Sequence, residues 1–281
     1  MANIRELLLL GKEKLEQSGN EYAKYERKVL LEEVLGCNYL YMLMNEEEQV
    51  PEEKERQYME WIEKRCTHYP LQYLLGYTHF MEDTFFVNPH VLIPRSDTEI
   101  LVEFADHLIE KTQNAGEWKV LDLCCGSGCI GISLKRYHKE LHLTLADISR
   151  EALEVAERNL DMHQVEASVV CSDLLQDIGE RMHMIVCNPP YIESRIVDTL
   201  MPEVRDYEPR LALDGGEDGL EFYRRIVDTA PEHLETGGWL ILEIGHDQAD
   251  AVSGLMEQYG FSEIAVLKDY AGLDRVVYGH L

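Results

Sequence analysis

From Lys119 onward, apolar runs of strand length alternate with segments whose apolar residues recur at helical spacing. Seven runs are strand candidates: 120–123, 141–146, 168–171, 184–187, 239–244, 263–267 and 275–278. Such alternation predicts a mainly parallel sheet covered by helices on both faces, the α/β class. Only residues 268–274 separate the last two runs, too few for a crossover helix. We therefore expect an antiparallel final pair.

The first 75 residues have helical periodicity, interrupted at Gly19–Asn20, at 36–38 and at Pro51. Alternating apolar residues in the next stretch, among them Phe80 and Phe85, favour two short strands in a hairpin. We predict a helical domain over 1–75, a β-hairpin connector over 76–95 and the α/β domain over 96–281. The mixed charge of the helical domain leaves substrate docking and simple packing as alternatives.

A capping box is expected where the α/β domain begins, at Ser96-Asp97-Thr98-Glu99. In this motif the Ser96 side chain accepts from the Glu99 backbone N–H, and the Glu99 side chain reaches back to Ser96. A helix with Ile100, Leu101 and Phe104 on one face should follow.

A glycine-containing loop joins the first strand to its helix, and it predicts a nucleoside site. Taken alone, the G-x-G-x-x-G pattern of 126–131 also fits a dinucleotide. Asp147 closes the second strand, where an acidic side chain can accept hydrogen bonds from ribose hydroxyls. Asp173 and Leu174 follow the third strand and would border an adenine, although Asp173 could equally cap a turn. The candidate cofactor residues in the loop are Asp122, Cys124, Cys125, Gly126, Ser127 and Gly128.

Two features favour a methyl donor over a dinucleotide. Asp122, inside the first strand, would repel a pyrophosphate but suits the amino-acid end of a nucleoside methyl donor. The fourth strand ends in Asn188-Pro189-Pro190-Tyr191, a sequence with no role in hydride transfer.

The two prolines force the chain to leave the sheet sharply after Asn188, because each lacks an N–H and has a fixed φ. Asn188, the Pro189 carbonyl and the Tyr191 ring then lie at a strand's carboxyl end, where open α/β sheets bind ligands. Asn188 would border both the donor and the substrate. The alternative is a plain strand-ending turn.

Charge and cysteine content limit the partners. The formal net charge is −27, and the sequence has no basic patch to bind phosphates, which disfavours bare DNA or RNA as a partner. Acidity can also serve solubility alone.

Seven cysteines suit reduced thiols, and they lack a second Cys or His pair at zinc spacing, so we expect no metal. No apolar run of about 18 residues and no signal-peptide layout is present. We expect a cytoplasmic monomer that contacts neither membrane nor nucleic acid.

Together, the glycine loop, Asp147 and the Asn-Pro-Pro-Tyr turn resemble class I S-adenosylmethionine-dependent methyltransferases that modify planar amide or amino nitrogens. Further stretches narrow the resemblance to the release factor glutamine methyltransferase family over nearly the whole chain: 70–76, 92–99, 208–209, 213–220 and 271–275. The implied fold is the Rossmann-like seven-stranded class I methyltransferase sheet. Two departures stand out. Ser96 replaces a usual Pro, and Cys124 and Cys125 replace a usual Gly and Thr, so Cys124 should need a backbone conformation that glycine reaches more easily.

The resemblance implies N5-methylation of the glutamine side-chain amide in the Gly-Gly-Gln loop of class I peptide chain release factors. Asn188 and Pro189 would then hold the amide against a rigid Pro190 turn and the Tyr191 face. Glu208 and Pro209 are candidates for substrate contact, with loop geometry alone as the alternative. The rival function is methylation of adenine or guanine amino groups in DNA or RNA, which needs a basic groove.

Overall fold

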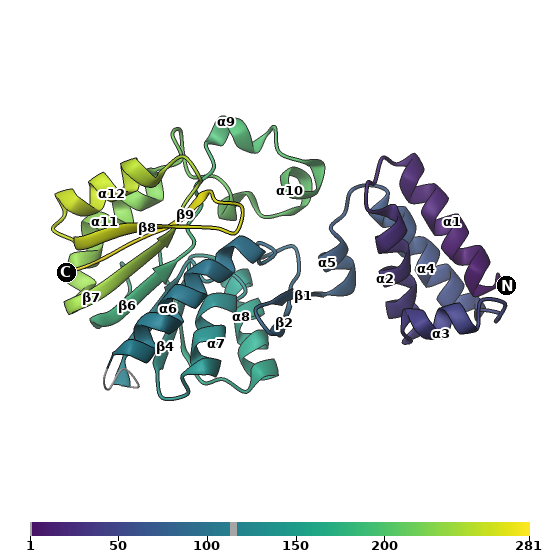
Figure 1. Cartoon of the computed structure of the whole chain (residues 1–281), viewed down its shortest axis with the longest axis horizontal. Coiled ribbons are helices and arrows are strands. Elements are labelled where there is room, and N and C mark those ends of the chain that lie inside the picture. Colours follow the sequence, from purple (N-terminus) through teal and green to yellow (C-terminus); the bar gives the residue numbers. More distant parts are fainter. Residues whose placement is uncertain (1, 113–116) are drawn as a thin grey trace. The chain divides into compact units, whose positions relative to one another are not determined.

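The computed structural model describes residues 2–112 and 117–281, which divide into two compact units (Figure 1). The first unit comprises the chain up to Gly76 together with Met201–Tyr207. The second comprises Tyr77–Leu200 and Glu208–Leu281. The sequence gives no sign that 201–207 belongs with the N-terminal helices.

Helices build the first unit, and they end where the breakers predict. Gly36, at φ 70°, ends one helix in the left-handed conformation, Asn38 caps the next through its side chain, and Pro51 precedes a third. A complete capping box forms between Asn3 and Glu6. The helices are α1 (Ile4–Gln17), α2 (Ala23–Leu35), α3 (Tyr39–Met44), α4 (Glu52–Arg65), α5 (Leu71–Leu75) and α10 (Pro202–Tyr207).

A buried ion pair lies inside this helical unit. The Arg65 guanidinium donates to both carboxylate oxygens of Glu26, at 2.7 and 3.0 Å, and both side chains are about 5% exposed. Arg65 also pairs with Glu203 of α10. One cation thus links α4 to α2 and to a segment almost 140 residues further along the chain.

A seven-stranded sheet forms the centre of the second unit, with strand order β5-β4-β3-β6-β7-β9-β8. The first five strands of this order run parallel, and β9 is antiparallel to both β7 and β8, as predicted. The strands are β3 (Lys119–Leu123), β4 (His142–Asp147), β5 (Ser168–Cys171), β6 (Met182–Cys187), β7 (Leu234–Glu243), β8 (Ser262–Lys268) and β9 (Asp274–His280).

Two apolar cores cover the two faces of the sheet, because alternate residues of each strand point to opposite sides. Val120 of β3 and Val186 of β6 pack on one side with the helices α6 (Glu99–Lys111), α7 (Cys129–Tyr137) and α8 (Arg150–His163). Leu121 and Ile185 pack on the other side with α11 (Glu221–His233) and α12 (Ala249–Gln258). Helix α9 (Ser194–Val197) and the 3-10 turn η3 (Arg210–Ala212) lie in the connection after β6.

The hairpin forms as predicted, but the expected capping box is wrong. Strands β1 (Tyr77–Phe80) and β2 (Asp83–Phe86) pair antiparallel. Ser96–Thr98 wind into a 3-10 turn, η1, and the Glu99 N–H bonds to the Ser96 backbone carbonyl instead of its hydroxyl. The Glu99 carboxylate accepts from the Met81 N–H at 2.7 Å. A tertiary contact with the hairpin has therefore replaced the local cap.

Candidate active site

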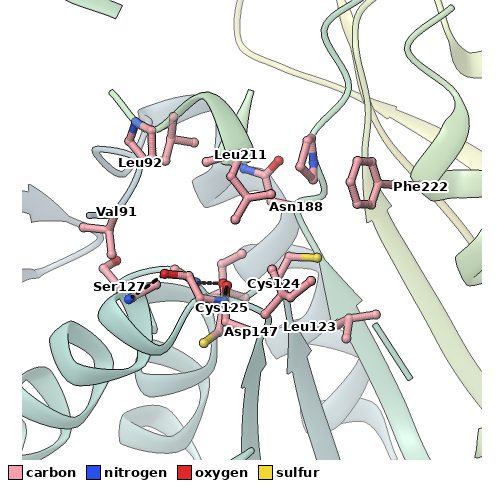
Figure 2. Close-up of a pocket in the computed structure, with 18 of the residues that line it drawn as sticks. Val91, Leu92, Leu123, Cys124, Cys125, Ser127, Asp147, Asn188, Leu211 and Phe222 are labelled. Carbon is pink, nitrogen blue, oxygen red and sulfur yellow. Dashed lines mark hydrogen bonds between the residues drawn. The ribbon is translucent and has the colours of Figure 1, made fainter. Parts of the chain in front are cut away.

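A cavity of about 320 Å³ opens at the carboxyl ends of the parallel strands, within the second unit (Figure 2). We call it the strand-end cavity. The loops that follow β3, β4, β5 and β6 supply residues 123–127, 147–149, 172–174, 188 and 190. Other segments supply residues 90–92, 94–95, 98, 129–130, 152, 209, 211–212, 222 and 225. The cavity lies where the strand-end argument places a ligand.

The loop after β3 bends so that its backbone faces the cavity. Cys124 adopts φ 57°, and Gly126 and Gly128 also have positive φ. The left-handed conformation expected of Cys124 is therefore confirmed, at a position where glycine would adopt it without strain. A Cβ on Gly128 would come within 3.1 Å of Ile132 and Leu145, so this glycine allows α7 to begin close against the sheet.

Asp147, at the end of β4, holds the shape of that loop. One carboxylate oxygen accepts the Gly126 N–H and the other accepts the Ser149 N–H, both at 2.9 Å. Burial raises the pKa of this carboxyl, while the backbone donors oppose the shift. Each carboxylate oxygen can accept more than one hydrogen bond, so Asp147 retains capacity for hydroxyl groups entering the cavity.

Asp122 lies outside the cavity lining, which corrects the prediction that it contacts the donor directly. Its side chain is fully buried, and one oxygen accepts the Gly131 N–H of α7 at 2.8 Å. The other oxygen has no hydrogen-bond partner among the described residues. The strand pleat points Asp122 into the β3–α7 packing layer, a direction that the motif alone does not reveal.

The buried environment of Asp122 predicts a dependence of stability on pH. Burial raises its pKa from 3.8 to about 8, so the folded chain favours the protonated form. The wild type should therefore lose stability as pH rises from about 4 through about 8. Asp122→Asn cannot ionise, so its melting temperature relative to wild type should increase across that window. Parallel melting curves at all pH values would contradict this, and exposed Asp198→Asn serves as the control.

The turn after β6 presents alternate residues to the cavity. Asn188 and Pro190 line it, whereas the side chains of Pro189 and Tyr191 lie outside the described lining. Asn188 donates from Nδ2 to the Thr98 hydroxyl at 3.3 Å. The Tyr191 hydroxyl donates to Glu243 at 3.3 Å. The prediction that the Tyr191 ring faces the cavity is therefore wrong. Figure 2 shows Asn188 across the cavity from the Cys124–Ser127 loop.

The adenine-side prediction and the Pro209 prediction both fall on lining residues. Asp173 lines the cavity but is held by Arg225 of α11 at 2.7 Å, and Leu174 adopts φ 54° beside it. Pro209 also lines the cavity. Gly128 does not, and it contributes only to the loop's backbone geometry.

Glu208 is not available for direct substrate contact, a second correction. Its buried carboxylate accepts from the Ile93 N–H at 3.2 Å and pairs with Arg95 at 2.5 Å. Glu208 thus joins the 91–95 segment to the segment preceding η3, and both segments line the cavity. These contacts hold the two segments of the cavity wall together.

Sequence reasoning assigns no role in the site to several of the lining residues. Val91, Leu92, Leu211 and Phe222 are apolar residues of loops and of a helix start, and they come together only in the fold. Thr98, which the sequence places in a capping motif, lines the cavity and contacts Asn188. The signal available for Leu92 and Thr98 is their place in the 92–99 stretch that carries the family resemblance.

Within residues 2–112 and 117–281, no group of three or more His, Cys, Asp or Glu side chains is arranged to hold a metal ion. None of the helices in the same ranges is long and apolar enough to cross a membrane. All seven cysteines are free thiols, and burial raises the pKa of Cys125, Cys129 and Cys187.

Comparison with known proteins places this site in a family. Residues 6–76 match the PrmC N-terminal domain and residues 100–203 match the Methyltransferase small domain. A release factor glutamine methyltransferase of Clostridium acetobutylicum is 38% identical over 279 residues, which covers 98% of this chain and 97% of the relative. The chain belongs to the release factor glutamine methyltransferase family. A relative of the same name from Geobacter sulfurreducens is also 38% identical, over 99% of this chain and 96% of its own length.

Solved structures confirm the fold class. A methyltransferase of Pyrococcus furiosus superposes with a TM-score of 0.51 at 16% identity, covering 70% of this chain and 87% of that one. A 16S rRNA methyltransferase of T. thermophilus, solved with AdoMet and guanosine, gives 0.52 at 18% identity, covering 73% and 49%. At these identities the likeness establishes the class I methyltransferase fold and nothing about the substrate.

Proposed function

We propose that this protein transfers a methyl group from S-adenosylmethionine to N5 of a glutamine side-chain amide, in the Gly-Gly-Gln motif of class I peptide chain release factors. The observation that carries the proposal is Asn188 at the cavity wall. Its Nδ2 is engaged by Thr98, and its Oδ1 bears no hydrogen bond within the described part of the chain. Family membership over nearly the full length supplies the substrate class.

The cavity suits the methyl donor. Asp147 offers carboxylate oxygens for ribose hydroxyls. Leu174, Ile148 and Phe222 offer apolar surface for an adenine. The open backbone at Gly126, where an added Cβ would meet nothing within 4 Å, leaves room for a ligand beside the loop. When bound, S-adenosylmethionine supplies an electrophilic methyl group.

An amide nitrogen is a weak nucleophile, since its lone pair is delocalised into the carbonyl. The chain can compensate by positioning it. The Asn188 Oδ1 and the Pro189 carbonyl provide two acceptors for the two amide N–H groups, holding the nitrogen for in-line attack at roughly 3 Å. Positive charge develops on nitrogen during transfer, so these acceptors stabilise the transition state more than the ground state. No general base is required, because the methylated nitrogen releases its proton to water.

The partners follow from charge and location. The net charge of −27 opposes phosphate binding and leaves a protein loop as the compatible substrate. We propose that the protein acts as a monomer in the cytoplasm, the compartment in which release factors are found. The rival function, methylation of a nucleobase amino group, would require a basic groove to hold an extruded base.

We further propose that the helical domain over 1–75 docks the release factor. It exposes large apolar side chains on α3, with Leu40 64% and Met44 78% exposed. Apolar exposure of this extent on a short helix suits a protein partner. The hairpin over 76–95 then connects it to the methyltransferase domain over 96–281.

The deciding experiment uses a donor carrying a labelled methyl group. We expect label to enter an intact release factor and to be absent when the glutamine of its Gly-Gly-Gln motif is replaced. Equal labelling of the substituted factor would overturn the assigned position. Stronger labelling of duplex DNA or of RNA than of the release factor would favour the nucleobase alternative.

A further inference from the structure

We propose that Gln248 and the 213–219 segment are positioning elements that fix the backbone of the Asn-Pro-Pro-Tyr turn, and so set the direction of the Pro189 carbonyl. The inference rests on the proposed function, in which that carbonyl is one of two acceptors for the amide nitrogen. The 213–219 segment belongs to a stretch that carries the family resemblance but has no role in the site so far. Among the described residues, neither this segment nor Gln248 lines the strand-end cavity.

The turn is anchored where it leaves the sheet. Cys187, the last residue of β6, is paired with Leu123 of β3 on one side and with Leu242 of β7 on the other. The two prolines that follow Asn188 each hold φ at about −65°, so few backbone torsions stay free before Tyr191. The direction of the Pro189 carbonyl therefore depends on how the far end of the turn is held.

The 213–219 segment holds that far end through backbone hydrogen bonds. The Ile192 N–H donates to the Leu213 carbonyl at 3.0 Å, and the Ile192 carbonyl accepts the Gly215 N–H at 2.8 Å. Ile192 and Asp214 consequently form a parallel bridge. The residue directly after the turn is thus paired like a residue of a sheet, although it lies outside the seven strands.

Two glycines bring this segment directly against the turn. A Cβ added to Gly215 would lie 2.7 Å from the Tyr191 Cα and 2.9 Å from the Pro190 carbonyl oxygen. A Cβ added to Gly219 would lie 2.5 Å from the Tyr191 carbonyl oxygen. These neighbours are backbone atoms, which cannot rotate away as a side chain can. A larger residue at either position must displace the turn.

Gln248, directly before α12, joins the same elements through its buried side chain. Its Nε2 donates to the Tyr191 carbonyl at 3.0 Å and to the Gly219 carbonyl at 3.2 Å. Its Oε1 accepts the Gly245 N–H at 2.8 Å. A backbone carbonyl can only accept and a backbone N–H can only donate, so the amide has a single satisfactory orientation. Both N–H bonds of Gln248 are therefore committed to holding the turn and the segment together.

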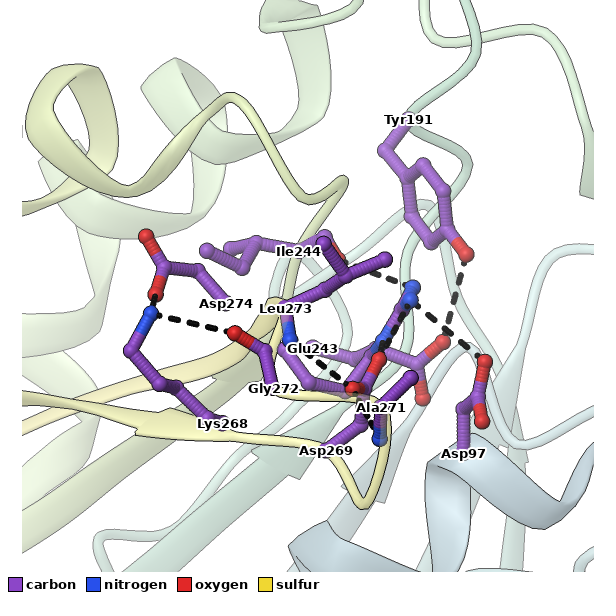
Figure 3. A network of polar contacts seen from close by, with 11 residues as sticks. Asp97, Tyr191, Glu243, Ile244, Lys268, Asp269, Ala271, Gly272, Leu273 and Asp274 are labelled. Atoms are coloured by element: carbon purple, nitrogen blue, oxygen red, sulfur yellow. Dashed lines mark hydrogen bonds and ion pairs between the residues drawn. The ribbon is translucent and has the colours of Figure 1, made fainter.

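The Tyr191 side chain adds a further attachment to the sheet. Its hydroxyl donates to Glu243 Oε1 at 3.3 Å (Figure 3). Glu243 is buried at the end of β7, and its backbone is paired with Val276 of β9. Tyr191 is thus held at its carbonyl by Gln248 and at its hydroxyl by the sheet.

Rigid support of this kind matters because the reaction depends on positioning. Two acceptors hold an amide nitrogen in line only when both occupy fixed places, and a misplacement of about 1 Å can cost about 100-fold in rate. The Asn188 side chain and the Pro189 carbonyl belong to neighbouring residues of one turn. Fixing the turn at both ends therefore fixes both acceptors before the substrate binds.

The first test compares Gly215→Ala with Gly179→Ala in the full chain, with a release factor and labelled donor. Neither glycine has a positive φ, and a Cβ on Gly179 would meet nothing within 4 Å. We expect Gly215→Ala to lower kcat about 10-fold or more, and Gly179→Ala to stay within about 2-fold of wild type. The donor dissociation constant and KM for the release factor should change less than about 3-fold in both variants.

The second test removes the donors of Gln248 without changing its size. Gln248→Glu keeps an oxygen for the Gly245 N–H but turns an oxygen toward the two carbonyls. We expect kcat to fall about 10-fold, with donor binding and KM again within about 3-fold of wild type. Gln258→Glu adds the same charge at the exposed last residue of α12 and should match wild type.

The separation of kcat from binding distinguishes positioning from a packing role. A loss of stability alone would lower the melting temperature and leave kcat of the folded enzyme unchanged, so rates are compared well below each variant's melting temperature. Should Gly215→Ala not fold, Gln248→Glu decides the question. Wild-type kcat in either folded variant, a loss equalled by its control, or lost donor binding would overturn the inference and leave the proposed function intact. Failure of the wild type to label any release factor would overturn both.

Discussion

Asn188→Ala is expected to lower kcat for release-factor methylation by about 100-fold or more. The side chain lines the cavity, and in the proposed mechanism its oxygen is one of two acceptors that hold the amide nitrogen in line. Removing it leaves the nitrogen free to rotate and leaves the developing positive charge unmatched on one side. Single-turnover rates with labelled donor measure this loss without a contribution from product release.

Donor binding separates this effect from damage to the cavity. Asp147 and the 124–127 loop retain their contacts in the variant, so the donor dissociation constant should change less than about 3-fold by calorimetry. Asn188→Asp provides a comparison that keeps an oxygen toward the substrate, replaces the donor to Thr98 with a second oxygen and adds a negative charge. We expect it to retain more activity than the alanine variant. Lost donor affinity with unchanged kcat would instead place Asn188 in the cofactor site.

The architecture could be predicted because its signals are local and periodic. Strand–helix alternation predicts parallel pairing, and the short 268–274 link leaves only an antiparallel end, which β8 and β9 form. The left-handed backbone of Cys124, at φ 57°, was expected on a different ground, because the resembling family usually has Gly at this position. Only the strand pairing depends on sequence spacing alone.

The errors in the site share one cause: a motif names residues without saying which way their side chains point. Asp122 sits in the expected strand but points into the β3–α7 layer, and Tyr191 turns its hydroxyl to Glu243. The Glu208 carboxylate pairs with Arg95, which is 113 residues away in the chain. Glu99 meets the hairpin backbone instead of Ser96. Such long-range partners decide side-chain roles, and no local pattern encodes them.

Arg65→Ala is expected to destabilise the first unit by about 3 kcal/mol or more. The substitution leaves Glu26 buried, with the Asn20 amide as its remaining side-chain donor, so a carboxylate that was paired at 2.7 Å loses its counter-charge. It also removes the contact with Glu203 that ties α10 to this unit. Hydrogen exchange should show the loss as faster exchange confined to residues 2–76 and 201–207, because the sheet of the second unit does not use this pair.

KM for the release factor in the Arg65→Ala variant shows whether the helical unit docks the substrate or only packs. If this unit binds the release factor, loosening it should raise KM for the factor several-fold while kcat at saturation and donor affinity stay near wild type. Lys14→Ala, which breaks the exposed pair with Glu63, is the control and should cost less than about 0.5 kcal/mol and leave KM unchanged. A destabilised Arg65→Ala variant with wild-type KM would reduce the unit to packing. The substrate would then be selected entirely at the strand-end cavity, where Asn188 is proposed to hold the amide.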